Sequence, residues 1–252
     1  MTGKIKAVTF DLWETIIHDE SDEPKRIAKG LRTKPHERRH LLWEALSADR
    51  PIRYEDVCAA YDVADAAFTK AWKGDSITWT IGERLEEILK GLGRELGSGD
   101  FTRVTKLHEE MEVTVPPNAI DGAGEALAEL AGRYKLSIVS DTIVTPGSQL
   151  RALLAVHDLE RHFTGFAFSD EVGRSKPHPS MFEEAARQLG VEVAEMVHVG
   201  DRDHNDVKGA QALGMKAVLF TATRDADAAD TSADAICSSY ADLPGIIDAL
   251  AG

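Results

Sequence analysis

After residue 116 the chain alternates regularly between short apolar runs and helix-period segments, with short connections between them. The predicted strands lie at 136–140, 166–169, 196–199 and 216–220, and the predicted helices at 122–132, 147–154, 179–189, 206–213 and 240–249. A further short, β-branched run, KIKAVTF, opens the chain at residues 4–10. Strands that alternate with helices pair in parallel, and the helices cover both faces of the sheet. The sequence therefore predicts a doubly wound α/β core.

Residues 18–114 have a different sequence pattern, with few β-branched runs and several segments of helical period. The predicted helices of this region lie near 35–48, 54–72, 81–96 and 100–111. The turn signal Pro116-Pro117 precedes the return to strand and helix alternation. We expect two domains: an α/β core of residues 1–17 and 115–252, and an all-helical cap of residues 18–114 inserted into it.

The charge balance restricts the partners that we expect. The chain of 252 residues has 29 basic and 43 acidic side chains, a net charge of −14, and an acidic surface repels nucleic acids and anionic lipids. The two cysteines, Cys58 and Cys237, lack the spacing of a disulfide framework or a zinc site. With no signal peptide and no apolar run of about 18 residues, we predict a cytoplasmic protein. Its expected partner is a small molecule, and we expect a monomer or a homodimer.

Polar side chains follow four of the predicted strands. They are Asp11, then Ser140-Asp141, then the loop Ser175-Lys176-Pro177, and finally Gly200-Asp201 with Asp206. In open α/β sheets, ligands bind beyond the carboxyl ends of the strands. A strand-end carboxylate can attack phosphorus, and a lysine held in a loop before proline can neutralise phosphoryl oxygens. Taken one by one, Asp11 could equally cap a loop, an isolated serine such as Ser140 would more often cap a helix, and a lysine usually lies on the surface.

Together these residues form four short motifs: FDLWET at 10–15, Ser140 after Ile138-Val139, SKPHP at 175–179 and GDRDHND at 200–206. In order and spacing the set resembles the motifs of the haloacid dehalogenase-like (HAD) hydrolase superfamily. The resemblance covers the core on both sides of the insert, and the insert has the position of a C1-type cap. It implies a Rossmann-like core and a hydrolase in which Asp11 attacks phosphorus to form an aspartyl-phosphate.

The resemblance also implies the remaining site residues. It places Mg²⁺ on Asp11, Asp201 and the main-chain carbonyl of Trp13, because hard oxygen atoms are the ligands that Mg²⁺ prefers. Asp206 would support the metal through water or orient Lys176, although a helix N-terminal acid is an alternative. The phosphate-binding positions implied are Leu12, Trp13, Ser140, Asp141, Thr142 and Lys176. Of these, Lys176 and Ser140 join Asp11 as the catalytic residues.

Trp13 departs from the family pattern. Most phosphatases of the superfamily have a second Asp at this position, which protonates the leaving group and then activates water. An indole has no titrating group in the useful range and cannot transfer protons. Since general acid–base catalysis contributes ~10²–10⁴-fold, we expect a preference for good leaving groups such as acyl phosphates. Glu14 and His18 are nearby replacements to consider.

Two other functions stay open. The 2-haloacid dehalogenases of the superfamily resemble this chain in having a bulky aromatic residue at position 13, and they displace halide without metal. The GDRDHND motif nevertheless retains Asp201 and Asp206, which suit phosphoryl transfer rather than attack on carbon. A HAD-like binding module with weakened catalysis would explain Trp13 but not the retained acids. The sequence therefore favours a Mg²⁺-dependent phosphohydrolase for a small phosphorylated metabolite.

Within the cap, we consider Trp79 and Arg84 as substrate contacts.

Overall fold

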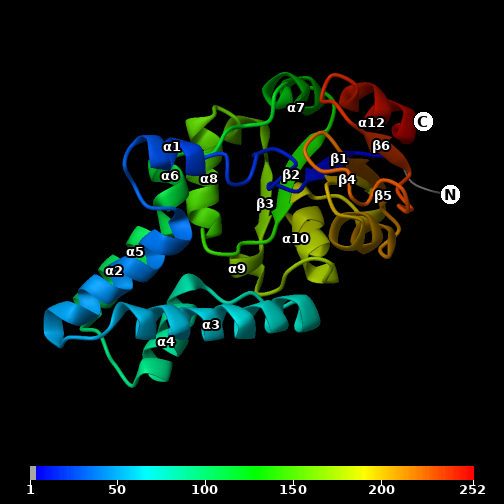
Figure 1. Cartoon of the computed structure of the whole chain (residues 1–252). Helices are drawn as coiled ribbons and strands as arrows, with labels where there is room; N and C mark the ends of the chain where they lie inside the picture. Colours follow the sequence, from blue (N-terminus) through cyan, green and yellow to red (C-terminus); the bar gives the residue numbers. More distant parts are fainter. Residues whose placement is uncertain (1–3) are drawn as a thin grey trace. The chain divides into compact units, whose positions relative to one another are not determined.

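The computed structural model describes residues 4–252 (Figure 1). The chain forms two compact units, the first made of residues up to Asp19, Asn118–Asp141 and Leu154–Gly252, and the second of Glu20–Pro117 and Thr142–Leu153. The second unit thus differs from the predicted insert of 18–114 at its edges and by including 142–153. One cause is that Arg84 Nη1 donates a 2.6 Å hydrogen bond to the Ile143 carbonyl, and Val144 packs on the helical core.

A six-stranded sheet, in which every neighbouring pair is parallel, forms the centre of the first unit. Its strands stand in the order β3-β2-β1-β4-β5-β6 (Figure 1). They are β1 (Ala7–Phe10), β2 (Lys135–Ser140), β3 (Gly165–Phe168), β4 (Met196–Gly200), β5 (Lys216–Phe220) and β6 (Ala235–Cys237). Strands buried on both faces are nearly continuous apolar runs, as all four buried residues of β1 illustrate. The predicted doubly wound α/β core is confirmed.

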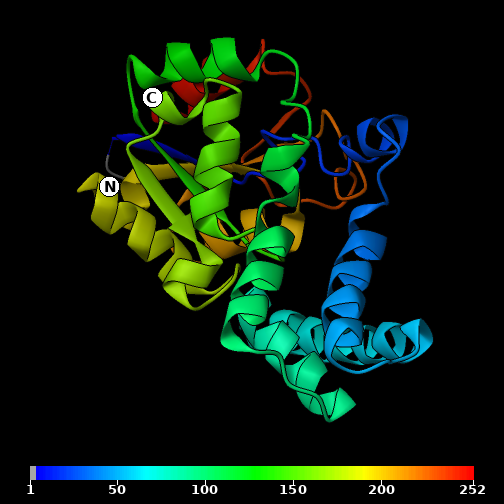
Figure 2. The ribbon, with the colours of Figure 1, turned by 90° about the vertical axis from the view of Figure 1, so that its left-hand side faces the viewer.

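Helices cover both faces of this sheet. Figures 1 and 2 both show α7 (Ala123–Ala131) and α12 (Leu243–Ala251) on one face and α10 (Pro179–Leu189) on the other. The shorter elements of this region are α9 (Ser169–Val172), η1 (Glu160–His162), η2 (Val193–Glu195), the π-helix η3 (Asp203–Lys208) and α11 (Gly209–Gln211). Helix α8 (Gly147–Val156) starts in the second unit and ends in the first. The helices thereby bury the sheet and leave the strand ends to carry polar residues.

Helix α10 shows how the local sequence sets these elements. Pro179 occupies the first turn, where a fixed φ and a missing N–H cost nothing. Gly190 ends the helix at a positive φ of 64°, a conformation that glycine adopts without strain. Between them, Met181, Phe182 and Leu189 are buried against the sheet. Each such side chain stabilises the fold by about 1.5–3 kcal/mol relative to exposure.

The second unit is all-helical. Its helices are α1 (Glu23–Ala28), α2 (Lys34–Asp49), α3 (Tyr54–Asp75), α4 (Ile81–Leu92), α5 (Ser98–Glu109) and α6 (Met111–Thr114). Apolar residues of α2 to α5, such as Leu46, Tyr61, Leu85 and Val104, form one buried cluster. Helix α4 is capped at its start by a reciprocal pair of hydrogen bonds between Thr80 and Glu83.

A buried ion triad joins the first and last parts of the helical unit. The Lys34 Nζ atom lies 2.9 Å from Asp22 Oδ1 and 3.0 Å from Glu112 Oε1. Burial by itself would lower the pKa of Lys34, but the two carboxylates outweigh it and raise that pKa.

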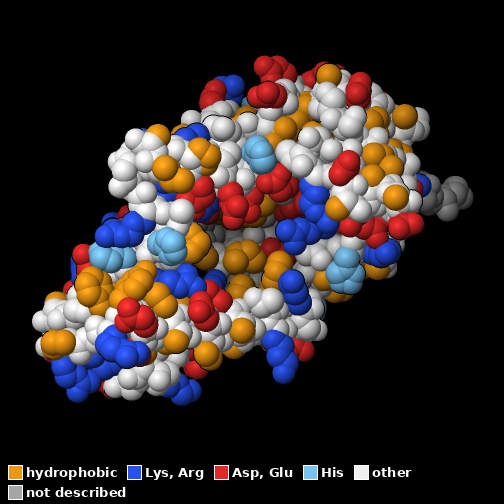
Figure 3. Space-filling model, in the orientation of Figure 1, with side chains coloured by type: hydrophobic (Ala, Val, Ile, Leu, Met, Phe, Trp, Pro, Cys, Tyr) orange, Lys and Arg blue, Asp and Glu red, His pale blue; other side chains and the backbone are white. Residues whose placement is uncertain are grey.

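On the molecular surface, acidic and basic side chains are interspersed over the face drawn in Figure 3. Within residues 4–252, every helix is too short or too polar to cross a bilayer.

Candidate active site

Three carboxylates meet at the carboxyl edge of the sheet. Asp11 follows β1, Asp201 follows β4, and Asp206 lies in the π-helix after β4. One ligand oxygen from each lies within 4.8 Å of the others, and all three residues are buried. They meet because β1 and β4 are neighbours, with Phe10 opposite Val199, and because the Asp11 N–H donates to the Val199 carbonyl at 2.9 Å. The motif spacing predicted this convergence from the sequence.

Lys176 bridges two of these carboxylates. Its Nζ atom lies 2.7 Å from Asp11 Oδ1 and 2.7 Å from Asp206 Oδ1. The Lys176 N–H also donates to Asp141 Oδ1 at 2.8 Å, which ties the lysine loop to the end of β2. Burial would lower the pKa of Lys176, but Asp11, Asp206 and Asp141 outweigh it and raise that pKa well above its usual range. The lysine is therefore a fixed positive charge beside Asp11.

Asp206 is held by three donors. Its Oδ1 atom accepts from Lys176 and lies 3.1 Å from His198 Nε2, while its Oδ2 atom accepts from the Arg202 N–H at 3.0 Å. Burial raises the pKa of Asp206, but Lys176 and His198 overcome this effect and hold the pKa below its usual range. The four sequence motifs do not include His198, although a histidine inside the apolar strand MVHVG is a polar residue that needs a partner.

Asp201 is the carboxylate with an unsatisfied atom. Its Oδ2 atom is buried and has no hydrogen-bond partner within residues 4–252. Burial, and then the negative charges of Asp11 and Asp206, raise the pKa of Asp201 to about 7. A divalent cation would satisfy this oxygen and relieve the repulsion between the carboxylates. The donor set of hard carboxylate oxygens fits Mg²⁺.

The end of β2 supplies a hydroxyl with no partner. Ser140 is fully buried, and among the described residues its Oγ atom finds no hydrogen-bond partner. A buried polar atom left in this state is expected to bind a ligand or water. Burial raises the pKa of the adjacent Asp141 to about 6, against the opposing effect of Lys176. Thr142 is also buried, and it opens the chain segment that belongs to the second unit.

The loop after Asp11 is a tight turn. The Leu12 carbonyl accepts from the N–H groups of Ile16 and Ile17, at 2.8 and 2.9 Å. Trp13 is half-buried in this turn, and Glu14 has a positive φ of 56°. The Glu14 carboxylate accepts from the Asp19 N–H at 2.8 Å and pairs with His18 at 3.1 Å. The two residues considered as replacements for the missing acid are thus bonded to each other.

The loop after β5 binds the motif loops of the same unit. Thr223 Oγ1 donates to the Glu14 carbonyl at 2.6 Å, and Arg224 Nη1 donates to the Asp201 carbonyl at 2.9 Å. Arg224 is in turn paired with Asp227 at 2.8 Å. In the sequence this segment is an acidic run of low complexity, TRDADAADTSADA at 223–235, and residue type alone does not show which backbone groups a loop reaches.

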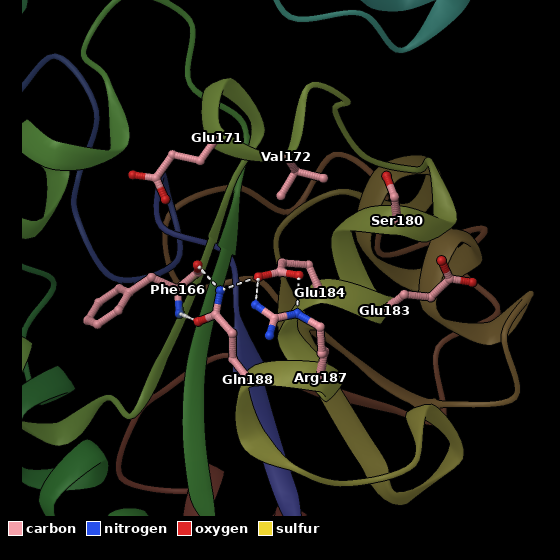
Figure 4. A pocket seen from close by; sticks show the side chains of 8 residues that line it. All are labelled: Phe166, Glu171, Val172, Ser180, Glu183, Glu184, Arg187 and Gln188. Atoms are coloured by element: carbon pink, nitrogen blue, oxygen red, sulfur yellow. Dashed lines mark hydrogen bonds and ion pairs between the residues drawn. The ribbon is translucent and has the colours of Figure 1, made fainter.

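A surface hollow of about 430 Å³ lies elsewhere on the first unit (Figure 4). It is lined by Phe166, Glu171, Val172, Ser180, Glu183, Glu184, Arg187 and Gln188. Arg187 pairs with Glu184, and the Gln188 amide accepts from the Phe166 N–H at 2.7 Å and donates to its carbonyl at 2.9 Å. Gln188 thereby covers peptide groups of the edge strand β3. We assign these contacts to the fold rather than to a ligand.

Gly200 provides a first test of the geometry. An added Cβ atom at this position would overlap Asp206 Cγ and lie 2.6 Å from Asp206 Cβ. We expect Gly200→Ala to displace Asp206 and to lower the free energy of unfolding by about 1–3 kcal/mol, as overpacked cores do. Urea denaturation measures the change. The control is Gly245→Ala, where the added atom meets nothing within 4 Å. Equal stability of Gly200→Ala and the wild type would contradict the arrangement.

Comparison with known proteins places this site in a family. The family model of haloacid dehalogenase-like hydrolases matches residues 5–214. A protein of Bos taurus named haloacid dehalogenase-like hydrolase domain-containing protein 3 is 35% identical over 234 residues, which are 90% of this chain and 86% of the relative. A glyceraldehyde 3-phosphate phosphatase of Methanopyrus kandleri is 38% identical over 85 residues, 34% of this chain and 35% of the relative. The first relatives are thus matched over about a third to two fifths of their length.

A solved structure agrees in fold. The 2-haloacid dehalogenase from Pseudomonas syringae pv. Tomato DC3000 has a TM-score of 0.70 and 21% sequence identity, over 98% of this chain and 99% of that chain. The family model covers most of this chain, and the Bos taurus relative covers nearly all of it. The motif-based prediction of a hydrolase is confirmed, and the chain belongs to the haloacid dehalogenase-like hydrolase family.

Proposed function

We propose that this protein is a Mg²⁺-dependent phosphohydrolase that acts on a small phosphorylated metabolite through a phosphoenzyme on Asp11. The observation that carries the proposal is the Lys176 ammonium, which lies 2.7 Å from both Asp11 and Asp206. It lies in the same cluster as Asp201, whose buried Oδ2 atom has no hydrogen-bond partner within residues 4–252. A cation bridging two carboxylates fixes the orientation of Asp11, and it also neutralises charge that develops on a phosphoryl group.

Two displacements at phosphorus make up the proposed reaction. Lys176 orients Asp11 through its Oδ1 atom, and a carboxylate oxygen of Asp11 forms a bond to phosphorus while the bond to the leaving group breaks. The Ser140 hydroxyl, buried and without a protein partner in the described chain, donates to a phosphoryl oxygen. Water then attacks phosphorus, which releases inorganic phosphate and restores the Asp11 carboxylate.

The acidic cluster is the proposed metal site. Asp11 and Asp201, with the Trp13 carbonyl, would hold Mg²⁺, and Asp206 would support it through Oδ2 or a water molecule. When bound, the ion neutralises negative charge on the phosphoryl oxygens. Since both lone pairs of Asp206 Oδ1 face Lys176 and His198, that oxygen is not free to bind a metal.

Trp13 sets the proposed substrate preference. With no titrating group at this position, protonation of a poor leaving group is unassisted, and phosphates with good leaving groups react fastest. The relatives named glyceraldehyde 3-phosphate phosphatase support a small phosphorylated substrate.

The test measures phosphate release from acetyl phosphate, an aryl phosphate and glycerol phosphate, each with Mg²⁺ and with EDTA. We expect release in the order acyl, aryl, alkyl, and a loss of at least about 100-fold with EDTA that added Mg²⁺ reverses. Equal release with EDTA and Mg²⁺ would contradict the metal requirement. If the protein released phosphate from none of the three substrates, the proposed function itself would be contradicted.

Haloacid dehalogenation is the second candidate, and Trp13 is the observation that favours it. An aromatic side chain at this position suits attack on carbon, in which no proton needs to be delivered to halide. Asp201 and Asp206 argue against it, because a metal-ligand cluster has no part in that reaction. Halide release from 2-chloropropionate in EDTA, without phosphate release from acetyl phosphate in Mg²⁺, would reverse our order of preference.

A further inference from the structure

We propose that His198 is a positioning residue: it holds Asp206 in the orientation from which Asp206 anchors Lys176 against Asp11. The inference rests on the proposed function, since it concerns the lysine that would face the phosphoryl group. It adds to the four motifs a residue that lies inside a strand rather than after one.

The register of the sheet brings the participating groups together. Thr9 of β1 and His198 of β4 are direct partners across the parallel pair. His198 Nδ1 lies 2.8 Å from Thr9 Oγ1, and His198 Nε2 lies 3.1 Å from Asp206 Oδ1. From the same oxygen the chain of contacts continues to Lys176, at 2.7 Å, and on to Asp11. Every member of this chain of contacts is buried.

The chemistry of the two neighbours determines which ring nitrogen carries the proton. An ionised carboxylate oxygen accepts hydrogen bonds only, so Nε2 of His198 must donate to Asp206. In the neutral ring Nδ1 then accepts from the Thr9 hydroxyl at 2.8 Å, which is closer than the other acceptor of that hydroxyl, the Val197 carbonyl at 3.4 Å. The ring is also packed edge to face on Phe182, with centroids 5.1 Å apart and planes at 88°. The imidazole is thus fixed in both rotation and tautomer.

This arrangement fixes the Asp206 carboxylate. His198 and Lys176 occupy Oδ1, and the Arg202 N–H occupies one side of Oδ2. Three donors in different directions favour this one orientation of the carboxylate, which anchors Lys176. Without His198 the carboxylate can turn toward Lys176 and Arg202 alone, which lets the ammonium shift relative to Asp11. A residue that supports a site in this way typically affects activity by roughly 10–100-fold.

The decisive experiment compares His198→Phe with His198→Gln. Phenylalanine keeps the ring against Phe182 but removes both hydrogen bonds, and we expect kcat for acetyl phosphate to fall roughly 10–100-fold with little change in KM. The glutamine amide can donate to Asp206 and accept from Thr9, and we expect it to restore kcat to within about threefold of the wild type. Thr9→Val, with Thr9→Ser as its control, repeats the comparison from the other side of the ring.

A spectroscopic measurement tests the contact without activity. We expect the ¹⁵N NMR spectrum of the wild-type protein to show His198 protonated at Nε2, the atom that faces Asp206. Thermal unfolding shows which variants are folded. If His198→Phe is unfolded, the comparison of kcat between Thr9→Val and Thr9→Ser replaces it as the test. A folded His198→Phe with kcat within about twofold of the wild type, a glutamine variant as slow as the phenylalanine variant, or an Nε2 atom without a proton would each overturn the inference. If the wild type releases no phosphate, the proposed function fails, and the NMR result still decides the His198 contact.

Discussion

Replacing Asp11 by asparagine is expected to lower phosphate release from acetyl phosphate by at least roughly 10³-fold. An amide oxygen is a poor nucleophile, and the amide cannot form the acyl phosphate that splits the reaction into two steps. The substitution keeps the size of the side chain and removes one of three mutually repelling carboxylates. Against this gain stands the loss of the buried ion pair with Lys176, and we expect Asp11→Asn to remain folded because Asp206 still pairs with that lysine.

The matched control is Asp158→Asn. Asp158 is an exposed carboxylate paired with Arg161, and its positive φ of 59° is one that asparagine tolerates. The Asp158→Asn variant should release phosphate from acetyl phosphate in Mg²⁺ as fast as the wild type. If Asp11→Asn kept more than about a tenth of the wild-type rate, Asp11 would not be the nucleophile, and the proposed mechanism would be wrong.

Replacing Trp13 by aspartate is expected to raise the turnover of glycerol phosphate, by up to ~10²–10⁴-fold if the new carboxyl group transfers protons efficiently. Trp13 is half-buried in the turn that follows Asp11 and contributes no titrating group. An aspartate two residues after the nucleophile would protonate the leaving alkoxide and then activate water. Acetyl phosphate, whose leaving group needs little assistance, should gain far less.

Trp13→Phe separates proton transfer from the loss of bulk. It shortens the aromatic side chain without adding a titrating group, and we expect no gain with glycerol phosphate. Circular dichroism and thermal unfolding establish that both variants are folded. A folded Trp13→Asp protein with no gain on the alkyl substrate would show that Trp13 does more than delete an acid, and the leaving-group explanation would then be withdrawn.

The sequence predicted the parts of the fold that have strong periodicity. Strand β5 and helix α10 occur at their predicted bounds, 216–220 and 179–189. The positions of Asp11, Lys176 and Asp201 could be predicted because a parallel sheet brings all its strand ends to one edge, so that motifs 190 residues apart meet there.

Short elements were missed because few residues encode them. Strand β6 has three residues, Ala235–Cys237, and follows a run that is acidic and of low complexity. The predicted helix at 206–213 is a π-helix from Asp203 followed by one turn of α-helix. Within the π-helix, the Asp206 carboxylate contacts Lys176 and His198, which lie in other elements. Such long-range contacts leave no local pattern.

The site residues that were missed share one property: they act on other protein groups. Arg224 reaches the Asp201 carbonyl, and His198 reaches the Asp206 carboxylate. A sequence motif marks where a reacting group lies, whereas the identity of its support depends on strand register, such as the pairing of Thr9 with His198. Register is set by tertiary packing and could not be predicted from one sequence.

Trapping of the phosphoenzyme tests directly whether Asp11 is the nucleophile. The wild-type protein is mixed with acetyl phosphate and Mg²⁺, quenched in acid within the first turnover, digested, and analysed by mass spectrometry. We expect one added phosphoryl group on the peptide that contains Asp11, and no such group in Asp11→Asn or in samples without Mg²⁺. Phosphate release by the wild type with the phosphoryl group on another residue, or with no label at any quench time, would contradict it.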